Sequence, residues 1–127
     1  MKTIINTEHA PAPVGPYNQS IAAGGLLFIS GQVAIDPASG KLNQDSIEAE
    51  TTQVLQNIGA ILKAAELSFA EVVKCSVFVK DMDHFGRINA VYTGFFEGVA
   101  APARELVEVA RLPLDANIEI SAIAVLK

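Results

Sequence analysis

The chain has few of the residues on which metalloproteins, disulfide-bonded proteins and membrane proteins depend. It contains one cysteine, two histidines and no tryptophan, and no apolar run approaches the roughly 20 residues that cross a bilayer. A single cysteine, Cys75, cannot form an internal disulfide, which is typical of a reducing compartment. His9 and His84 lie far apart in the chain, so no zinc site is expected.

The sequence also lacks an excess of positive charge and a phosphate-binding loop. Its formal net charge is −5, whereas proteins that bind nucleic acid through phosphate contacts usually present a basic surface. No glycine-rich loop follows a predicted strand, so no nucleotide cofactor is indicated. Asn6 and Glu8 interrupt the N-terminal apolar residues, unlike a secretory signal. We expect a cytoplasmic protein that uses no metal or organic cofactor, with neither nucleic acid nor membranes among its partners.

Apolar residues, in contrast, are abundant. Half of the 127 residues are hydrophobic and 18% are charged, which suits one folded domain over residues 1–127. A small domain has much surface for its volume, so this content indicates either a well-filled core or an apolar surface that another subunit covers.

Hydrophobic periodicity predicts six strands and two helices. In the clearest helix, Val54, Leu55, Ile58 and Ile61 recur on one stripe. Strands are predicted at residues 3–5, 19–23, 26–35, 72–80, 104–111 and 117–126, and helices at 46–65 and 83–98. This order indicates an α+β domain, in which both helices pack on one face of a single mixed six-stranded sheet.

The other face of that sheet is then either exposed to solvent or buried against a partner. Alternation in the strand at 104–111 turns Val107 towards the helices and places Arg104 and Leu106 on the uncovered face. Glu119 or its neighbours share that face, depending on the register. Because the uncovered face mixes aliphatic residues with a few charges, we interpret it as a subunit interface.

Arg104 and Glu119 are the main candidates for chemistry, and we expect them on neighbouring strands. The guanidinium of Arg104, just after Pro102, could hold a carboxylate through two hydrogen bonds. The alternative is a surface salt bridge at a strand end. Glu119 lies between two isoleucines, where a partly desolvated carboxylate could accept a proton from water. Its alternative is an ordinary solvent-facing strand residue.

The weaker candidates are Tyr17, Ser30, Gly31 and Asn89. Tyr17 ends a stiff, proline-rich loop and either points at a ligand or packs that loop down. Ser30 and Gly31 lie at the end of an apolar strand segment, where glycine permits close approach of the backbone. Asn89, on the second helix, is either exposed or hydrogen-bonded between elements. Cys75 is expected to be a buried, unreactive thiol.

At these positions the chain resembles the Rid family of reactive-intermediate deaminases, in its RidA branch. The similarity extends over nearly the whole chain and is carried by residues 10–19 (APAPVGPYNQ), 27–32 (LFISGQ), 36–40 (DPASG), 72–81 (VVKCSVFVKD), 89–92 (NAVY) and 102–113 (PARELVEVARLP). It implies a homotrimer of chorismate-mutase-like domains whose sheets face inward, with active sites between subunits. It also implies cofactor-free hydrolysis of 2-aminoacrylate-type enamines and 2-imino acids to 2-oxo acids and ammonia.

The resemblance further implies roles for individual residues. Arg104 would bind the substrate carboxylate, and Glu119 would activate the attacking water. The backbone at Leu106 would contact the water or the leaving nitrogen. The rest of the pocket would comprise Tyr17, Ser30, Gly31 and Asn89.

The chain departs from the pattern of its relatives directly after the arginine. Glu105 and Leu106 stand where Ser or Thr, and then Cys or Thr, are common. Ser121 replaces a frequent glutamate. Two other functions remain open: a non-catalytic module that binds small carboxylates, and ribonuclease activity or inhibition of translation. The acidic charge weighs against the last of these.

Overall fold

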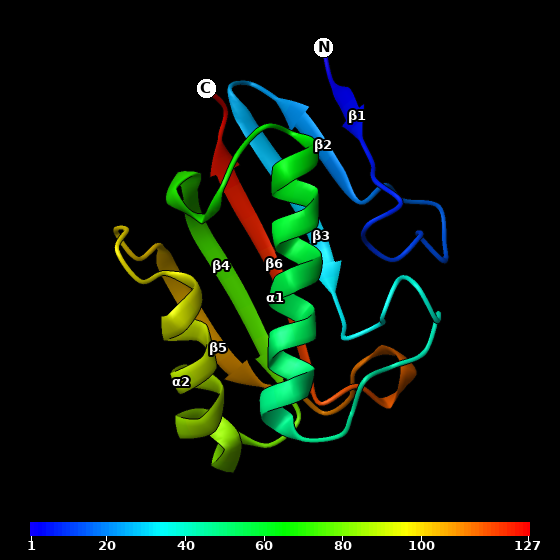
Figure 1. Ribbon diagram of the computed structural model, residues 1–127, viewed down its shortest axis with the longest axis vertical. Helices are drawn as coiled ribbons and strands as arrows, with labels where there is room; N and C mark the ends of the chain where they lie inside the picture. The colour runs from blue at the N-terminus through cyan, green and yellow to red at the C-terminus, as the bar shows by residue number, and fades with distance from the viewer.

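Six strands form one sheet, and two helices pack across one of its faces in this computed structural model, which describes residues 1–127 (Figure 1). The elements are β1 (Thr3–Ile5), β2 (Ser20–Ala23), β3 (Leu26–Gln32), α1 (Ile47–Ala64), β4 (Val72–Val79), α2 (Phe85–Phe95), β5 (Ala103–Glu108) and β6 (Ile118–Val125). The strand order is β1-β2-β3-β6-β4-β5, and only β4 and β5 run parallel. The predicted α+β domain with a mixed six-stranded sheet is therefore confirmed.

The apolar stripe of α1 supplies much of the core. Val54, Leu55, Ile58 and Ile61 are all buried, and each aliphatic side chain removed from water stabilises the fold by about 2 kcal/mol. The helix begins where Ser46 caps it, with its Oγ accepting a hydrogen bond from the Ala49 N–H at 3.0 Å. The predicted helix at 46–65 is thus confirmed almost to the residue.

The strand predicted at 26–35 is shorter, because its last residues find a different partner. The amide of the buried Asn57, on α1, donates to the carbonyls of Val33 and Ile35 at 3.2 and 2.9 Å. A bulge between Ile29 and Gln32 also shifts the pairing of β3 with β6. The chain therefore leaves the sheet at Gln32.

The second helix and the fifth strand also differ from their predicted ranges. A 3₁₀ turn at Met82–His84, capped by the Asp81 carboxylate, precedes α2, so the helix itself covers only Phe85–Phe95. The strand predicted at 104–111 is confined to Ala103–Glu108.

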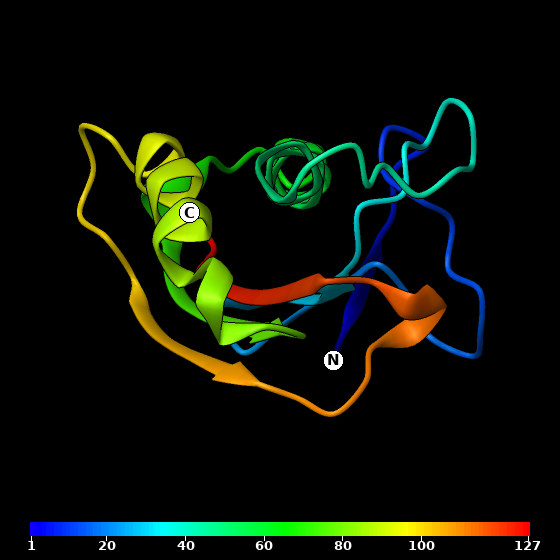
Figure 2. The same cartoon turned by 90° about the horizontal axis from the view of Figure 1, so that it is seen from below.

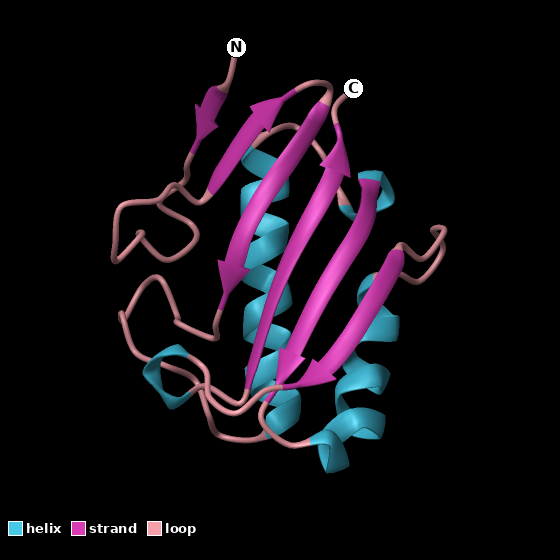
Figure 3. Ribbon diagram, turned by 180° about the vertical axis from the view of Figure 1, so that it is seen from behind, coloured by secondary structure: helices cyan, strands magenta, loops and turns pink.

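The face of the sheet away from the helices carries no other element. Figure 2 shows α1 and α2 on one side of the sheet, and Figure 3 shows the opposite face in full view. We call this the bare face. Phe28 and Val107 lie on it with 43% and 42% of their surfaces exposed. Exposed side chains of this kind favour a partner that covers the face.

The prediction for the faces of β5 is wrong. Arg104 pairs with Cys75 of β4 in the sheet register, and Cys75 is buried on the helix side. Alternation along the strand therefore turns Arg104 and Leu106 towards the helices and Val107 towards the bare face. The side chain of Leu106 packs against the core.

Candidate functional site

Glu119 lies on the bare face, over the bulge in β3. Its neighbours in β6, Ile118 and Ile120, are fully buried beneath the helices, so the carboxylate points the other way. A Cβ atom on Gly31 would lie 2.7 Å from Oε2 of Glu119, so only glycine leaves room for the carboxylate in this position. Burial raises the pKa of the Glu119 carboxyl above its ordinary value.

A cavity of about 150 Å³ opens beside this carboxylate. Besides Glu119 and Gln32, the side chains that line it are apolar or aromatic: Pro11, Ala12, Val14, Tyr17, Val33, Ile35, Pro113 and Leu114. Tyr17 and Glu119 thus line the same cavity, and Gly31 lies against the Glu119 carboxylate. Ser30 is next in the chain, but its hydroxyl donates to the Asn18 carbonyl at 2.6 Å.

The position of Tyr17 depends on a residue that sequence reasoning missed. Gln19 is buried, and its Nε2 donates to the carbonyls of Thr7, Ala10 and Pro11 at 2.9, 3.2 and 2.9 Å. Its Oε1 accepts from the Thr7 N–H at 2.7 Å. One amide thereby holds the proline-rich loop against the sheet, and nothing in the local sequence signals this function.

Arg104 lies in a different place, between β5 and α2. Its Nη1 donates to Oδ1 of Asn89 at 2.9 Å, and its guanidinium carbon is 4.7 Å from the centre of the Tyr92 ring. No carboxylate of the chain forms a salt bridge with Arg104, which rules out the expected alternative of a salt bridge within the chain. A cavity of about 300 Å³ adjoins it, lined also by Thr93, Phe96, Glu97, Ala101 and Pro102.

The candidate residues therefore form two half-sites on opposite faces of the sheet. Arg104 pairs with Cys75 of β4, whereas Glu119 pairs with Phe78, three residues further along the same strand. Because side chains alternate along β4 and these two partners are an odd number of residues apart, the side chains of Arg104 and Glu119 lie on opposite faces of the sheet. The expectation that they stand on neighbouring strands is also wrong, because β4 lies between β5 and β6.

Glu105, the residue at which the chain departs from its relatives, belongs to the bare face. Its carboxylate lies 2.9 Å from Nζ of Lys74 and accepts a hydrogen bond from the Ser76 hydroxyl. These two donors lower the pKa of the Glu105 carboxyl. Glu105 is therefore paired within its own sheet and does not compete for Arg104.

Other features have no direct part in either half-site. Cys75 is buried as predicted, and burial raises the pKa of its thiol. No group of three or more His, Cys, Asp or Glu side chains is placed to hold a metal ion. No helix has both the length and the apolar character needed to span a membrane.

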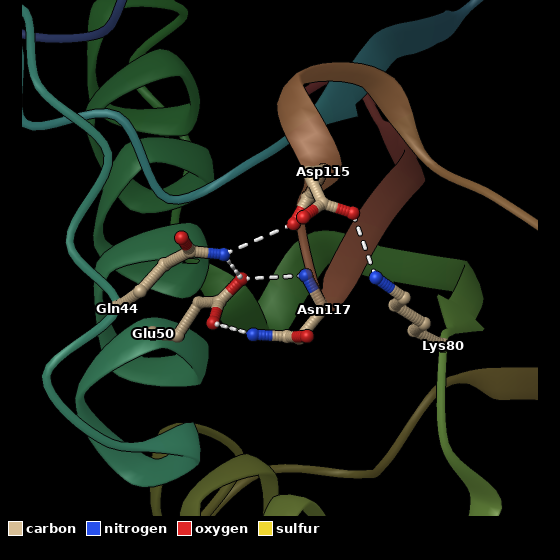
Figure 4. Close-up of polar contacts among 5 residues, drawn as sticks. All are labelled: Gln44, Glu50, Lys80, Asp115 and Asn117. Carbon is tan, nitrogen blue, oxygen red and sulfur yellow. Dashed lines mark hydrogen bonds and ion pairs between the residues drawn. The ribbon is translucent and has the colours of Figure 1, made fainter.

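A polar network holds the turn that carries Leu114 and leads into β6 (Figure 4). The buried carboxylate of Glu50, on α1, accepts from the backbone N–H and from Nδ2 of Asn117, both at 2.8 Å. Lys80 pairs with Asp115 at 2.7 Å, and Gln44 Nε2 donates to the Asp115 carbonyl at 3.2 Å. The turn is therefore attached both to α1 and to the end of β4.

The chain is similar to known proteins over nearly its whole length. A sequence model of the family described as Endoribonuclease L-PSP matches residues 7–126. A RutC family protein of Pyrococcus horikoshii is 52% identical over 124 residues, which cover 98% of each chain. The 2-iminobutanoate/2-iminopropanoate deaminase of Salmonella typhimurium is 46% identical over 127 residues, again 98% of each. The crystal structure of E. coli TdcF with bound serine superimposes with a TM-score of 0.94 at 40% identity, covering 98% of this chain and 99% of that one.

Proposed function

The chain belongs to the Endoribonuclease L-PSP family, and we propose that it hydrolyses 2-imino acids and their enamine tautomers to 2-oxo acids and ammonia. The substrates would be 2-iminopropanoate, with its tautomer 2-aminoacrylate, and 2-iminobutanoate. The observation that carries the proposal is the state of Arg104. Its guanidinium is oriented by Asn89 and Tyr92 and has no carboxylate partner in its own chain. Such a fork is preorganised for the carboxylate of a small acid.

The proposal includes a homotrimer, because one chain cannot bring the two half-sites together. Arg104 lies on β5, one of the two edge strands of the sheet, and Glu119 lies on the bare face. In a cyclic assembly with the bare faces turned inward, the edge of one copy can meet the bare face of the next. The exposed Phe28 and Val107 support an assembly that covers this face.

The residues have complementary tasks in the proposed reaction. Arg104 holds the carboxylate, which fixes the imine carbon in the seam. Glu119 of the neighbouring copy accepts a proton from water as the water oxygen bonds to that carbon, and it passes this proton to the imine nitrogen, which gives a neutral carbinolamine. Glu119 then accepts the hydroxyl proton of the carbinolamine and delivers it to the nitrogen. The C–N bond breaks, the C=O bond forms and ammonia leaves, with Glu119 ionised again.

The remaining candidates would shape the site. The backbone of Leu106 would contact the water or the leaving nitrogen, and Tyr17, Ser30, Gly31 and Asn89 would complete its walls. No metal or organic cofactor enters the proposed reaction, since positioning and one carboxylate can supply what imine hydrolysis requires. A cytoplasmic location suits this proposal and the single buried cysteine.

An assay with imine generated in solution tests the proposed activity. A threonine or serine dehydratase supplies the imine, and the release of 2-oxo acid and ammonia is followed with and without the protein. We expect both products to appear faster with the protein. An unchanged rate would contradict the proposal. Binding of 2-oxo acids without turnover would then favour the carboxylate-binding module, and cleavage of RNA would favour the activity in the family's description.

Gly31→Ala is expected to reduce this activity by about 10-fold to 100-fold while leaving the fold stable. The new Cβ would lie 2.7 Å from Oε2 of Glu119, so the carboxylate must move. It is the end of a flexible side chain, so its movement costs little stability. Steady-state kinetics and thermal unfolding together check the result, with Gly86→Ala as the control, since a Cβ there meets no atom. Unchanged kinetics in Gly31→Ala would contradict the placement of Glu119.

A further inference from the structure

We infer that the cavity beside Glu119 binds the side chain of the imino acid, and that Leu114 makes the protein prefer branched apolar chains over a methyl group. This inference rests on the proposed function, because it takes Glu119 to act at the imine carbon. Whatever is attached to that carbon must then lie beside the Glu119 carboxylate, which is where the cavity opens.

The lining of the cavity favours an apolar group. Glu119 is the only charged residue among those that line it, and no cation is available for an acidic side chain. Its volume is about 150 Å³. An apolar cavity of similar size in another protein holds benzene, so this one has room for well over one methyl group.

Leu114 has an unusual conformation for its position in the wall. Its backbone is left-handed, with φ of 59° and ψ of 23°, and Asp115 follows with φ of 54°. Residues other than glycine adopt this conformation rarely, and it persists where surrounding contacts impose it. Leu114 is 60% exposed, so an apolar residue is presented to solvent at the rim of an apolar cavity.

The polar network around Glu50 supplies those contacts (Figure 4). It fixes Asn117, three residues after Leu114, and the exposed Lys80–Asp115 pair holds the residue directly after Leu114. The turn that carries Leu114 is therefore anchored on its C-terminal side. An apolar wall that is anchored in this way discriminates between side chains by contact area, because it is less able to collapse onto a smaller group.

Kinetics with two imines test the inference. An amino acid oxidase generates 2-imino-4-methylpentanoate from leucine and 2-iminopropanoate from alanine. We expect kcat/KM of the wild type to be about 10-fold higher for the branched imine. Leu114→Ala should lose about 10-fold on the branched imine and stay within about twofold on the small one. Leu114→Asn suits the left-handed backbone but removes the apolar surface, and should behave like Leu114→Ala.

Controls separate this inference from the proposed function. Met82→Ala truncates an exposed apolar side chain in the turn before α2, outside both cavities and outside the bare face, and should change neither rate. If both imines are hydrolysed but the branched one is not preferred, or if Leu114→Ala affects both equally, the inference is overturned and the proposed function stands. If neither imine is hydrolysed, the proposed function fails. In that case the protein is titrated calorimetrically with 2-oxo-4-methylpentanoate and with 2-oxopropanoate. Tighter binding of the branched acid supports the inference, and equal affinities would overturn it.

Discussion

Arg104→Ala is expected to lower kcat/KM for 2-imino acid hydrolysis by about 100-fold or more. The guanidinium is the only cation in its half-site and would carry the charge-assisted hydrogen bonds to the substrate carboxylate. Without it, the carboxylate must leave water with no partner, and the imine carbon is no longer held where the activated water can reach it. The imine assay measures the loss directly.

Two controls distinguish a lost substrate contact from a damaged fold. Arg104→Lys keeps the charge but not the planar fork, so it should recover only part of the activity. Asn89→Ala leaves the cation in place but removes the acceptor that orients Nη1, so its effect should be smaller than that of Arg104→Ala. All three variants should unfold near the wild-type temperature, which thermal unfolding checks. Wild-type kinetics in Arg104→Ala would contradict the proposed function.

Much of the fold could be predicted because its signals are local. The stripe from Val54 to Leu62 has the period of a helix, and Ser46 before it is a good cap. The shorter range of β3 was not predictable in this way. Its cause is the amide of Asn57, which is more than twenty residues away along the chain. A side chain that takes backbone carbonyls out of a sheet leaves no local pattern.

The site was predicted less completely than the fold, for a similar reason. The structure places Tyr17 and Glu119 at one cavity and Asn89 and Arg104 at another. This separation could not be predicted, because it depends on which strand lies between β5 and β6. Alternation within one strand tells which residues share a face, but only the packing of α2 decides which face that is.

The two half-sites and the composition have a common explanation in the proposed assembly. A chain that is half hydrophobic leaves Phe28 and Val107 exposed on a face that no helix covers. In the same chain, one strand lies between those that carry Arg104 and Glu119, and the two side chains lie on opposite faces of the sheet. Association through the bare face would bury Phe28 and Val107. It would also bring Arg104 of one copy to Glu119 of another, so activity would depend on assembly.

Glu119→Gln is expected to lower kcat by about 100-fold to 10,000-fold, because glutamine cannot accept the proton from water. Substrate binding should weaken far less, since Arg104 is intact and the amide has nearly the same shape. In the wild type, the ionised carboxylate is the active form. Activity should therefore fall as the pH falls through the pKa of Glu119, which burial raises above its ordinary value. A pH–rate profile without this acid limb would contradict the role of Glu119.

Mixing the two inactive variants tests where the site is built. When Arg104→Ala and Glu119→Gln chains are unfolded together in equal amounts and refolded, a composite site can take an intact Arg104 from one chain and an intact Glu119 from the other. In a cyclic assembly with random mixing, about one quarter of the sites receive both residues, so about one quarter of wild-type activity should return. Each variant refolded alone should stay inactive. A mixture that also stays inactive, although gel filtration shows mixed assemblies, would mean that each site belongs to a single chain, and Arg104 and Glu119 could then not act on the same substrate.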